Sequence, residues 1–141
     1  MSVADNKRAQ IAVGDLWAAY GRQTAPGASP FSFPDIASLT CFADYRIPQL
    51  LRAERVLEYA APLAARVDAR ESVAAGSAEE LDLRACTVVA VERLRAALAA
   101  ELPAAAAAVL TSVELDWRLW QKGERRKDEM APHHRTLTIF Y

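Results

Sequence analysis

Residues 76–102 read GSAEELDLRACTVVAVERLRAALAAEL and contain the longest helical repeat of the chain. The stretch opens on Ser77, whose side chain can accept a bond at a helix N-terminus while Glu80 reaches back, as in a capping box. Apolar residues then recur every three or four positions, which is the period of one helical face. Pro103 follows directly and ends the pattern, so the stretch predicts one long helix to about Leu102. The buried stripe of this helix is expected to consist of Val88, Val91, Leu94, Leu98 and Leu102.

Shorter helical patterns lie on both sides of this long helix. Pro48 and Pro62 each suit the first turn of a helix, where the missing N–H costs nothing. The expected helices cover residues 5–20, 48–59, 62–68 and, through an alanine-rich tract, 103–122. The first of them has an imperfect apolar face, made of Ile11, Leu16, Trp17 and Tyr20.

Proline and glycine mark the main interruption of the helical pattern, over residues 21–34. We therefore divide the chain into an N-terminal helix and linker, residues 1–30, and a helical domain, residues 31–141. Polar and apolar residues alternate only at the C-terminus, where residues 135–141 predict a short strand or an extended segment against the helices. Without other strand patterns, the chain is expected to form a single, mainly α-helical domain.

Composition narrows the class of protein. The 141 residues carry 17 basic and 18 acidic side chains, a net charge of -1, which argues against a fold that grips nucleic acid by charge alone. The two cysteines, Cys41 and Cys86, form no CxxC motif, so neither a zinc site nor a redox motif is expected. The longest apolar tract, residues 103–110, is too short to span a bilayer. We expect a soluble, cytoplasmic protein without membrane contacts.

An acidic residue stands just before a predicted helix start, at Asp44. The free N–H groups and the dipole of a helix N-terminus favour the ionised form of such a carboxyl group, so Asp44 is a candidate pre-oriented anion. The alternative is that Asp44 is an ordinary helix cap and Arg46 its surface partner.

Two further sets of charged and aromatic residues share helix faces. Counting back from Val88 in steps of four gives Arg84 and Glu80, an ion pair that either closes a pocket or plugs the core. The alternative is a half-exposed salt bridge. Asp116, Trp117 and Trp120 lie within one helical turn and form a candidate platform for a flat heterocycle. The alternative is that both tryptophans fill core volume while Asp116 points to water.

Both histidines of the chain stand next to an arginine, in His133-His134-Arg135. Neighbouring side chains of an extended segment point to opposite sides, so a shared metal ion is improbable. Contact with a phosphate or carboxylate suits this pair of residue types better. The alternative is a polar turn that leads into the terminal segment.

Taken together, several blocks in register resemble the queuosine salvage protein family over about residues 31–141. The resemblance implies an all-helical fold similar to that of the helical DNA glycosylases. It also implies hydrolysis of the N-glycosidic bond of queuosine 5′-phosphate, which releases queuine for reuse in tRNA modification. The blocks are residues 31–35, 40–49, 76–85, 116–120 and 132–136, with Phe140 and Tyr141 at the end.

The resemblance also distributes roles over the candidate residues. It places the catalytic carboxylate at Asp44 and implies no metal or cofactor. The substrate would be queuosine 5′-phosphate or a related deazapurine nucleotide, with no direct nucleic-acid contact. The base would be recognised by Phe42, Asp116 and Trp117 or Trp120. Further candidate substrate contacts are Tyr45, Glu80 and Arg84, and for the 5′-phosphate Arg46, Lys122, His133 and Arg135.

Two rival functions remain open at this stage. Members of the family are longer and have an upstream region that contributes to the pocket, which residues 1–23 do not obviously match. The chain could therefore be a non-catalytic or split-subunit nucleotide-binding module that needs a partner chain or self-association to complete the pocket. A DNA glycosylase is the other rival, but the balanced charge and the lack of a glycine-rich hairpin argue against it.

Overall fold

The computed structural model describes residues 3–138 of the chain, and side chains from Lys7 onward. This part is mainly α-helical, as expected, and none of its helices is both long and apolar enough to cross a bilayer. Residues 3–138 form one isolated β-bridge, between Ser72 and Arg135. The elements are α1 (Val3–Ala19), the 3-10 helix η1 (Ile36–Ser38), α2 (Arg46–Ala53), α3 (Ala61–Asp68), α4 (Ala78–Glu101), α5 (Ala104–Val109) and α6 (Ser112–Arg125).

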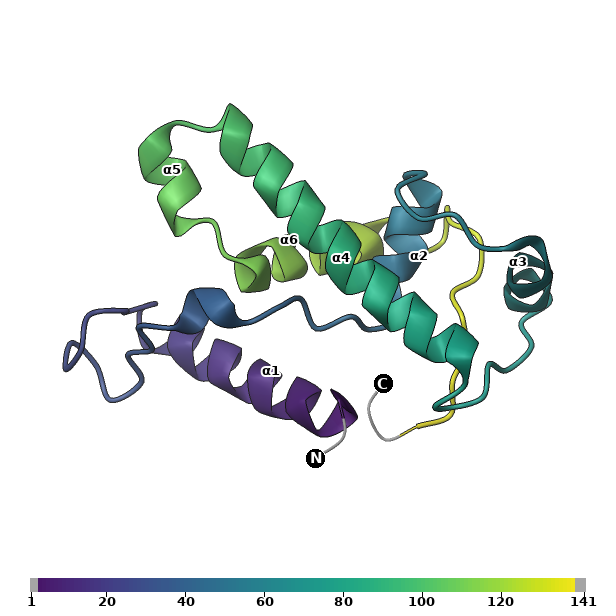
Figure 1. Cartoon of the computed structure of the whole chain (residues 1–141), viewed down its shortest axis with the longest axis horizontal. Helices are drawn as coiled ribbons and strands as arrows, with labels where there is room; N and C mark the ends of the chain where they lie inside the picture. Colours follow the sequence, from purple (N-terminus) through teal and green to yellow (C-terminus); the bar gives the residue numbers. More distant parts are fainter. Residues whose placement is uncertain (1–2, 139–141) are drawn as a thin grey trace.

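The core forms where α2 packs against both α4 and α6 (Figure 1). The short helix α2 contributes Ile47 and Leu51 to it, and the long helix α4 crosses over them with Val91. Leu115 of α6 and Cys41 of the segment before α2 complete the same cluster. Because α2 is anchored on two sides, the segment that leads into it, residues 40–45, is held in a fixed place.

Helix α1 packs through a different face from the predicted one. Trp17 is buried, but Leu16 and Tyr20 are 38% and 51% exposed. The contact runs instead through Gly14, where an added Cβ would lie 3.2 Å from Phe42 Cζ. The small glycine lets the helix approach the segment before α2 closely, and an apolar count along the sequence does not detect this.

The stripe predicted for α4 is correct only in its first half. Val91 is fully buried, with Val88 and Leu94 partly buried beside it, whereas Leu98 and Leu102 are exposed. The C-terminal half of α4 extends past α2 and is followed there by α5 (Figure 1). The periodic pattern is present there, but the described helices leave these two leucines uncovered.

The predicted C-terminal end of α3 is correct, whereas the predicted end of α2 is wrong. Helix α2 was expected to continue to residue 59 but ends at Ala53, because Arg55 adopts a left-handed conformation with φ 59°. The N–H of Val56 then donates to the carbonyl oxygen of Leu51 at 2.8 Å, which makes a Schellman ending. Arg70 ends α3 in the same way, with φ 60°. Glycine usually fills this position, so Arg55 gave no sequence signal for the end of α2.

The single helix predicted over residues 103–122 is wrong, because the chain forms two helices there. Helix α5 ends at Val109, and Thr111 caps α6 by accepting a bond from the N–H of Glu114 at 3.2 Å. Threonine followed three residues later by glutamate is a capping-box pattern. The sequence therefore contained the signal for this break.

Gly123 in α6 lies directly against the stem of Arg46. A Cβ atom added at Gly123 would come within 2.7 Å of Arg46 Cγ and 2.9 Å of its Cδ. Glu124 holds the far end of the Arg46 side chain, so the stem has little freedom to move aside. We therefore expect Gly123→Ala to lower the free energy of unfolding by about 1–3 kcal/mol, as measured by urea denaturation.

The variant Arg46→Ala supplies the matched background for this test. Without the arginine stem, Gly123→Ala should be neutral or stabilise α6 by up to about 1 kcal/mol, since alanine is the better helix former. An equal loss of stability in both backgrounds would show that the cost does not come from this contact.

Candidate functional site

An open cavity of about 640 Å³ lies between α1, the segment before α2 and the first turns of α4. Its walls are mostly apolar, and its charged lining residues are Lys7, Glu80 and Arg84. Such a hollow, apolar with a few charged groups, is typical of a small-molecule site. The other lining residues are Gln10, Thr40, Cys41, Phe42, Ala43, Ala75, Gly76, Leu81, Ala85, Val88 and Thr138.

Glu80 and Arg84 form an ion pair one turn apart on α4, at one wall of this larger cavity. The side chains are 4% and 14% exposed, so the pair is buried rather than half-exposed. Glu80 also accepts a bond from the N–H of Gly76 at 3.1 Å, while Ser77 caps the helix through the N–H of Glu80. The expected capping serine is thus confirmed, but the glutamate reaches back to Gly76, one residue further than a capping box requires.

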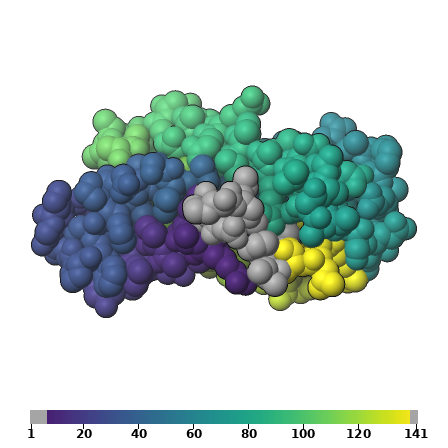
Figure 2. Space-filling view, turned by 60° about the horizontal axis from the view of Figure 1, so that its bottom comes forward, coloured from purple at the N-terminus to yellow at the C-terminus, as the bar shows by residue number. Residues whose placement is uncertain are grey.

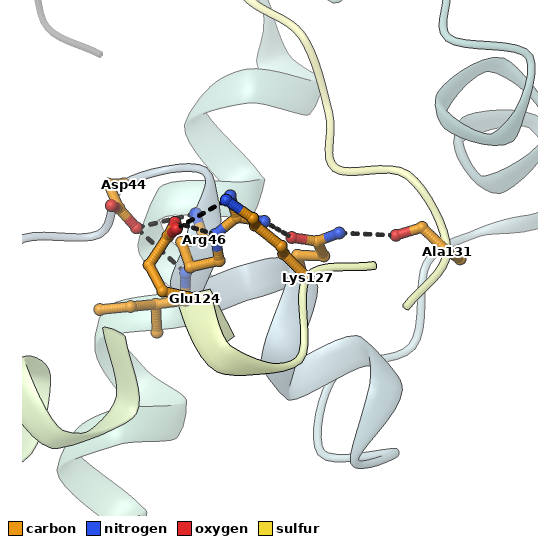
Figure 3. A network of polar contacts seen from close by, with 7 residues as sticks. Asp44, Arg46, Glu124, Lys127 and Ala131 are labelled. Atoms are coloured by element: carbon orange, nitrogen blue, oxygen red, sulfur yellow. Dashed lines mark hydrogen bonds and ion pairs between the residues drawn. The ribbon is translucent and has the colours of Figure 1, made fainter. Parts of the chain in front are cut away.

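Asp44 is half-buried at the start of α2, next to the larger cavity but outside its lining. Its Oδ1 accepts bonds from the N–H groups of Arg46 at 2.9 Å and Ile47 at 3.0 Å, which Figure 3 shows. Asp44 therefore caps the N-terminus of α2, as the alternative interpretation expected. Both bonds use the same oxygen. Oδ2 accepts no hydrogen bond from the described residues and is therefore available for a contact with a ligand. Asp44 stands between Ala43, which lines the larger cavity, and Tyr45, which lines a smaller one.

Asp116 of α6 fixes the backbone of this segment. It is 4% exposed, and its Oδ1 accepts a bond from the N–H of Phe42 at 2.7 Å. The next residue, Ala43, has a left-handed conformation with φ 35°, which is strained for any residue but glycine. The Asp116 bond on one side and the Asp44 cap on the other hold the chain in this turn, so the carboxylate of Asp44 is placed by two anchors.

Three charged side chains influence one another at this point: Lys7, Asp44 and Asp116. Burial raises the pKa of Asp116 to about 7, helped by the negative charge of Asp44 and opposed by the Phe42 bond and by Lys7. Burial also lowers the pKa of Lys7, which the two carboxylates counteract. The carboxyl group of Asp116 can therefore hold or release a proton near neutral pH.

The raised pKa of Asp116 predicts that stability depends on pH. Between about pH 4 and pH 7 the folded chain keeps a proton on Asp116 that the unfolded chain has released. The free energy of unfolding therefore falls as the pH rises through this range and levels off above it. The buried His134 acts in the opposite sense below pH 6.5, because burial lowers its pKa to about 4.

The variant Asp116→Asn isolates the carboxyl contribution, because asparagine can still accept the bond from Phe42 but cannot ionise. Urea denaturation at about pH 5 and about pH 8 should show a smaller loss of stability in the variant than in the wild type, by a few kcal/mol on the order of the pKa shift. An identical pH dependence in both proteins would contradict the assignment.

The smaller cavity, of about 290 Å³, is lined by Tyr45, Ser72 and residues 133–137. The His133 ring packs on Tyr45 with ring centres 4.6 Å apart. Arg135 is joined through its carbonyl oxygen to the N–H of Val73 at 2.7 Å, and Figure 2 shows this tail against the connection from α3 to α4. The structure thus brings together Tyr45, His133 and Arg135, three of the predicted substrate contacts.

Two of the cations predicted to bind phosphate are engaged elsewhere. Arg46 is buried, with its Nε 2.6 Å from Glu124 and a further bond to Gln49, which in turn holds Ala131 at 2.8 Å (Figure 3). It is neither a surface partner of Asp44 nor a cavity residue, and it ties α2 and α6 to the C-terminal tail. Lys122 pairs with the surface residue Glu54 at 2.8 Å and lines neither cavity.

The two tryptophans predicted as a base platform also lie outside both cavities. Trp117 contacts α1 near Gly14 and lies 5.7 Å below the guanidinium of Arg22. Trp120 is 42% exposed. Their spacing correctly placed them near Asp116 on one helix, but it could not tell which side of α6 faces a ligand.

Sequence reasoning missed Lys7 and Gln10 as cavity residues. Both lie on the face of α1 that continues to Gly14 and Trp17, in steps of three and four. Two polar residues on a packed face are the signal that could have found them. Cys41 also lines the cavity, but burial raises the pKa of its thiol to about 12, so it stays protonated. Among residues 3–138 no cluster of metal-binding side chains is present.

The family model and the similar proteins found by comparison all point to the same family. The family model described as queuosine salvage protein matches residues 2–141, which includes α1 and extends beyond the motif blocks in residues 31–141. Proteins named queuosine 5′-phosphate N-glycosylase/hydrolase from Dictyostelium discoideum and Sphaerobacter thermophilus are each 44% identical over 135 residues, 96% of this chain and 39% of theirs. One from Mus musculus is 34% identical over 143 residues, 99% of this chain and 41% of its own. The chain thus spans about two-fifths of the length of these relatives.

Proposed function

The chain belongs to the queuosine salvage protein family, and we propose that it acts in hydrolysis of the N-glycosidic bond of queuosine 5′-phosphate, releasing queuine. The substrate would be the free nucleotide and not a base within DNA. The observation that supports the proposal is that the neighbours of Asp44, Ala43 and Tyr45, line two cavities of different chemistry. A nucleotide that placed its base in one and its phosphate in the other would present its glycosidic carbon near Asp44.

The larger cavity suits the base. Its apolar walls and the Phe42 ring offer contact area to a flat heterocycle. The carboxylate of Glu80 can accept bonds from the N–H groups on the pyrimidine edge of a 7-deazaguanine, and Arg84 can donate to its carbonyl oxygen. Because this pair is already buried and held by Gly76, it would need little reorganisation when the base arrives.

The smaller cavity suits the 5′-phosphate. His133 and Arg135 are the polar and charged side chains there that favour contact with phosphate oxygens, and Ser72 can add a hydroxyl bond. Gln49 anchors the tail next to these residues through Ala131, so their positions depend on the network of Figure 3. Arg46 would support this site from behind.

The reaction itself is a displacement at C1′ by water. The C1′–N bond breaks with both electrons going to the base, and positive charge develops on the ribose ring. The carboxylate of Asp44 stabilises that charge. Water then bonds to C1′ and loses a proton, the base gains one, and the products are queuine and ribose 5-phosphate. Asp116, with a pKa of about 7, and Lys7 are the nearby groups suited to moving protons.

A second function is favoured by one observation, the share of the relatives that the chain covers. With 39% of their length matched, the chain could bind the nucleotide as a module that catalyses only with a partner chain. In that case the two cavities and Asp44 keep their roles, and the partner adds the remaining walls.

One assay separates these functions. The purified chain is incubated with queuosine 5′-phosphate, and free queuine is measured by chromatography, with the nucleoside queuosine as a control substrate. Release that prefers the phosphorylated substrate supports the hydrolase. Binding by calorimetry without release supports the module. Neither binding nor release would overturn both functions.

A further inference from the structure

A second hollow lies on the other side of α4 from the larger cavity. This groove, which we call the α4 groove, measures about 620 Å³ and runs between α4 and Val56 and Leu57 of the connection from α2 to α3. Arg93 is its single charged lining residue among the described part of the chain. The groove is lined by Val56, Leu57, Ala85, Cys86, Val89, Ala90, Arg93 and Leu94.

Large apolar side chains stand open to solvent at this groove. Val56 and Val89, which both line this groove, are each 49% exposed. On the opposite side the helix buries Val91 in the core. Apolar residues on both sides are typical of a helix enclosed within a larger protein, not of one at its edge. Single exposed valines are ordinary, but a lined apolar groove marks an interaction surface.

We propose that the α4 groove is the docking surface for the part of the queuosine salvage chain that the relatives carry outside the matched segment. More than half of each relative lies outside that segment, whereas the family match includes α4 from end to end. A groove on a helix shared by the family fits a covering element of the same family. The covering surface would present apolar side chains and one acidic group opposite Arg93.

Docking in the α4 groove would also affect the position of one wall of the larger cavity. Ala85 lines both the cavity and the α4 groove, so α4 forms a wall of each. Glu80 and Arg84 lie on this wall, within the five residues that precede Ala85. A covering element in the groove would therefore fix the helix that carries the ion pair.

Cys86 provides the readout for this proposal. It is exposed and lines the groove, whereas Cys41, the other cysteine of the chain, is buried. A maleimide should therefore label Cys86 selectively in the chain alone. If a partner covers the groove, labelling of Cys86 should slow by about tenfold or more.

The test co-expresses the full chain with the part of the Sphaerobacter thermophilus relative that lies outside the matched segment. We expect a one-to-one complex by light scattering in which Cys86 is protected. Val89→Glu should prevent both the complex and the protection, while Val109→Glu, the same change at an exposed valine of α5 outside the groove, should prevent neither.

Three results would overturn the proposal. In the first, the two co-expressed chains purify separately and form no complex. In the second, a complex forms but Cys86 reacts as fast as in the free chain. In the third, this chain alone forms a dimer in which Cys86 is protected. The labelling result on the unsubstituted complex decides the matter even if Val89→Glu fails to fold. None of these readouts depends on turnover, so the groove can fail while the hydrolase proposal stands, and the reverse.

Discussion

Replacing Asp44 with asparagine is expected to lower the rate of queuine release by about a thousandfold, because the developing positive charge at C1′ loses its counter-charge. Asparagine has the same shape and keeps an oxygen that accepts the bonds from Arg46 and Ile47, so the helix cap and the fold should persist. Calorimetry should therefore find queuosine 5′-phosphate bound about as tightly as by the wild type. Initial rates from chromatography measure the loss.

Two further variants make this result specific. Asp15→Asn removes the same charge from an exposed position on α1 and should leave turnover unchanged. Asp44→Ala removes the cap as well, so it should lower the free energy of unfolding by about 1 kcal/mol in addition to abolishing release. Near-normal turnover by Asp44→Asn would refute the role of this carboxylate.

The largest effect on stability is expected from Glu80→Ala. The substitution takes away the buried carboxylate that pairs with the partly buried Arg84 and accepts the bond from the Gly76 N–H. Removing one partner of a buried pair costs about 3–5 kcal/mol. Urea denaturation should show this loss. The neighbouring Glu79→Ala is the matched control, since its pair with Arg66 is much more exposed and should change stability by less than about 1 kcal/mol.

A double variant separates the structural role of the pair from a role in binding. Leucine at both Glu80 and Arg84 should restore most of the stability, because apolar residues of similar volume replace buried ion pairs at little cost. Base recognition should not return, since the donors and acceptors are gone. If the double variant recovers both stability and turnover, the pair does not bind the base.

The parts of the fold that the sequence predicted well are those with long, regular patterns. Helix α4 has a capping serine at one end and Pro103 at the other, and its bounds were predicted to within a residue or so. The error at the end of α2 occurred where local chemistry was unusual. Arg55 ends α2 in a conformation that glycine normally supplies, so the sequence gave no warning of that end. Similarity to the helical DNA glycosylases stays a prediction.

The candidate site was predicted in part, and the misses have a common cause. Asp44, Phe42, Glu80 and Arg84 lie in local sequence motifs, and the structure places them in or beside one cavity. Lys7 arrives there only because Gly14 lets α1 approach Phe42, a tertiary contact with no local pattern. Arg46 and Lys122 were plausible by charge, but their partners Glu124 and Glu54 are far away in sequence.

The most direct test of the central claim is a crystal structure of the Asp44→Asn variant with queuosine 5′-phosphate. The account predicts the base in the larger cavity beside Glu80 and Arg84, the phosphate next to His133 and Arg135, and C1′ facing position 44. A nucleotide whose C1′ lies away from position 44, or whose base occupies neither cavity, would contradict it.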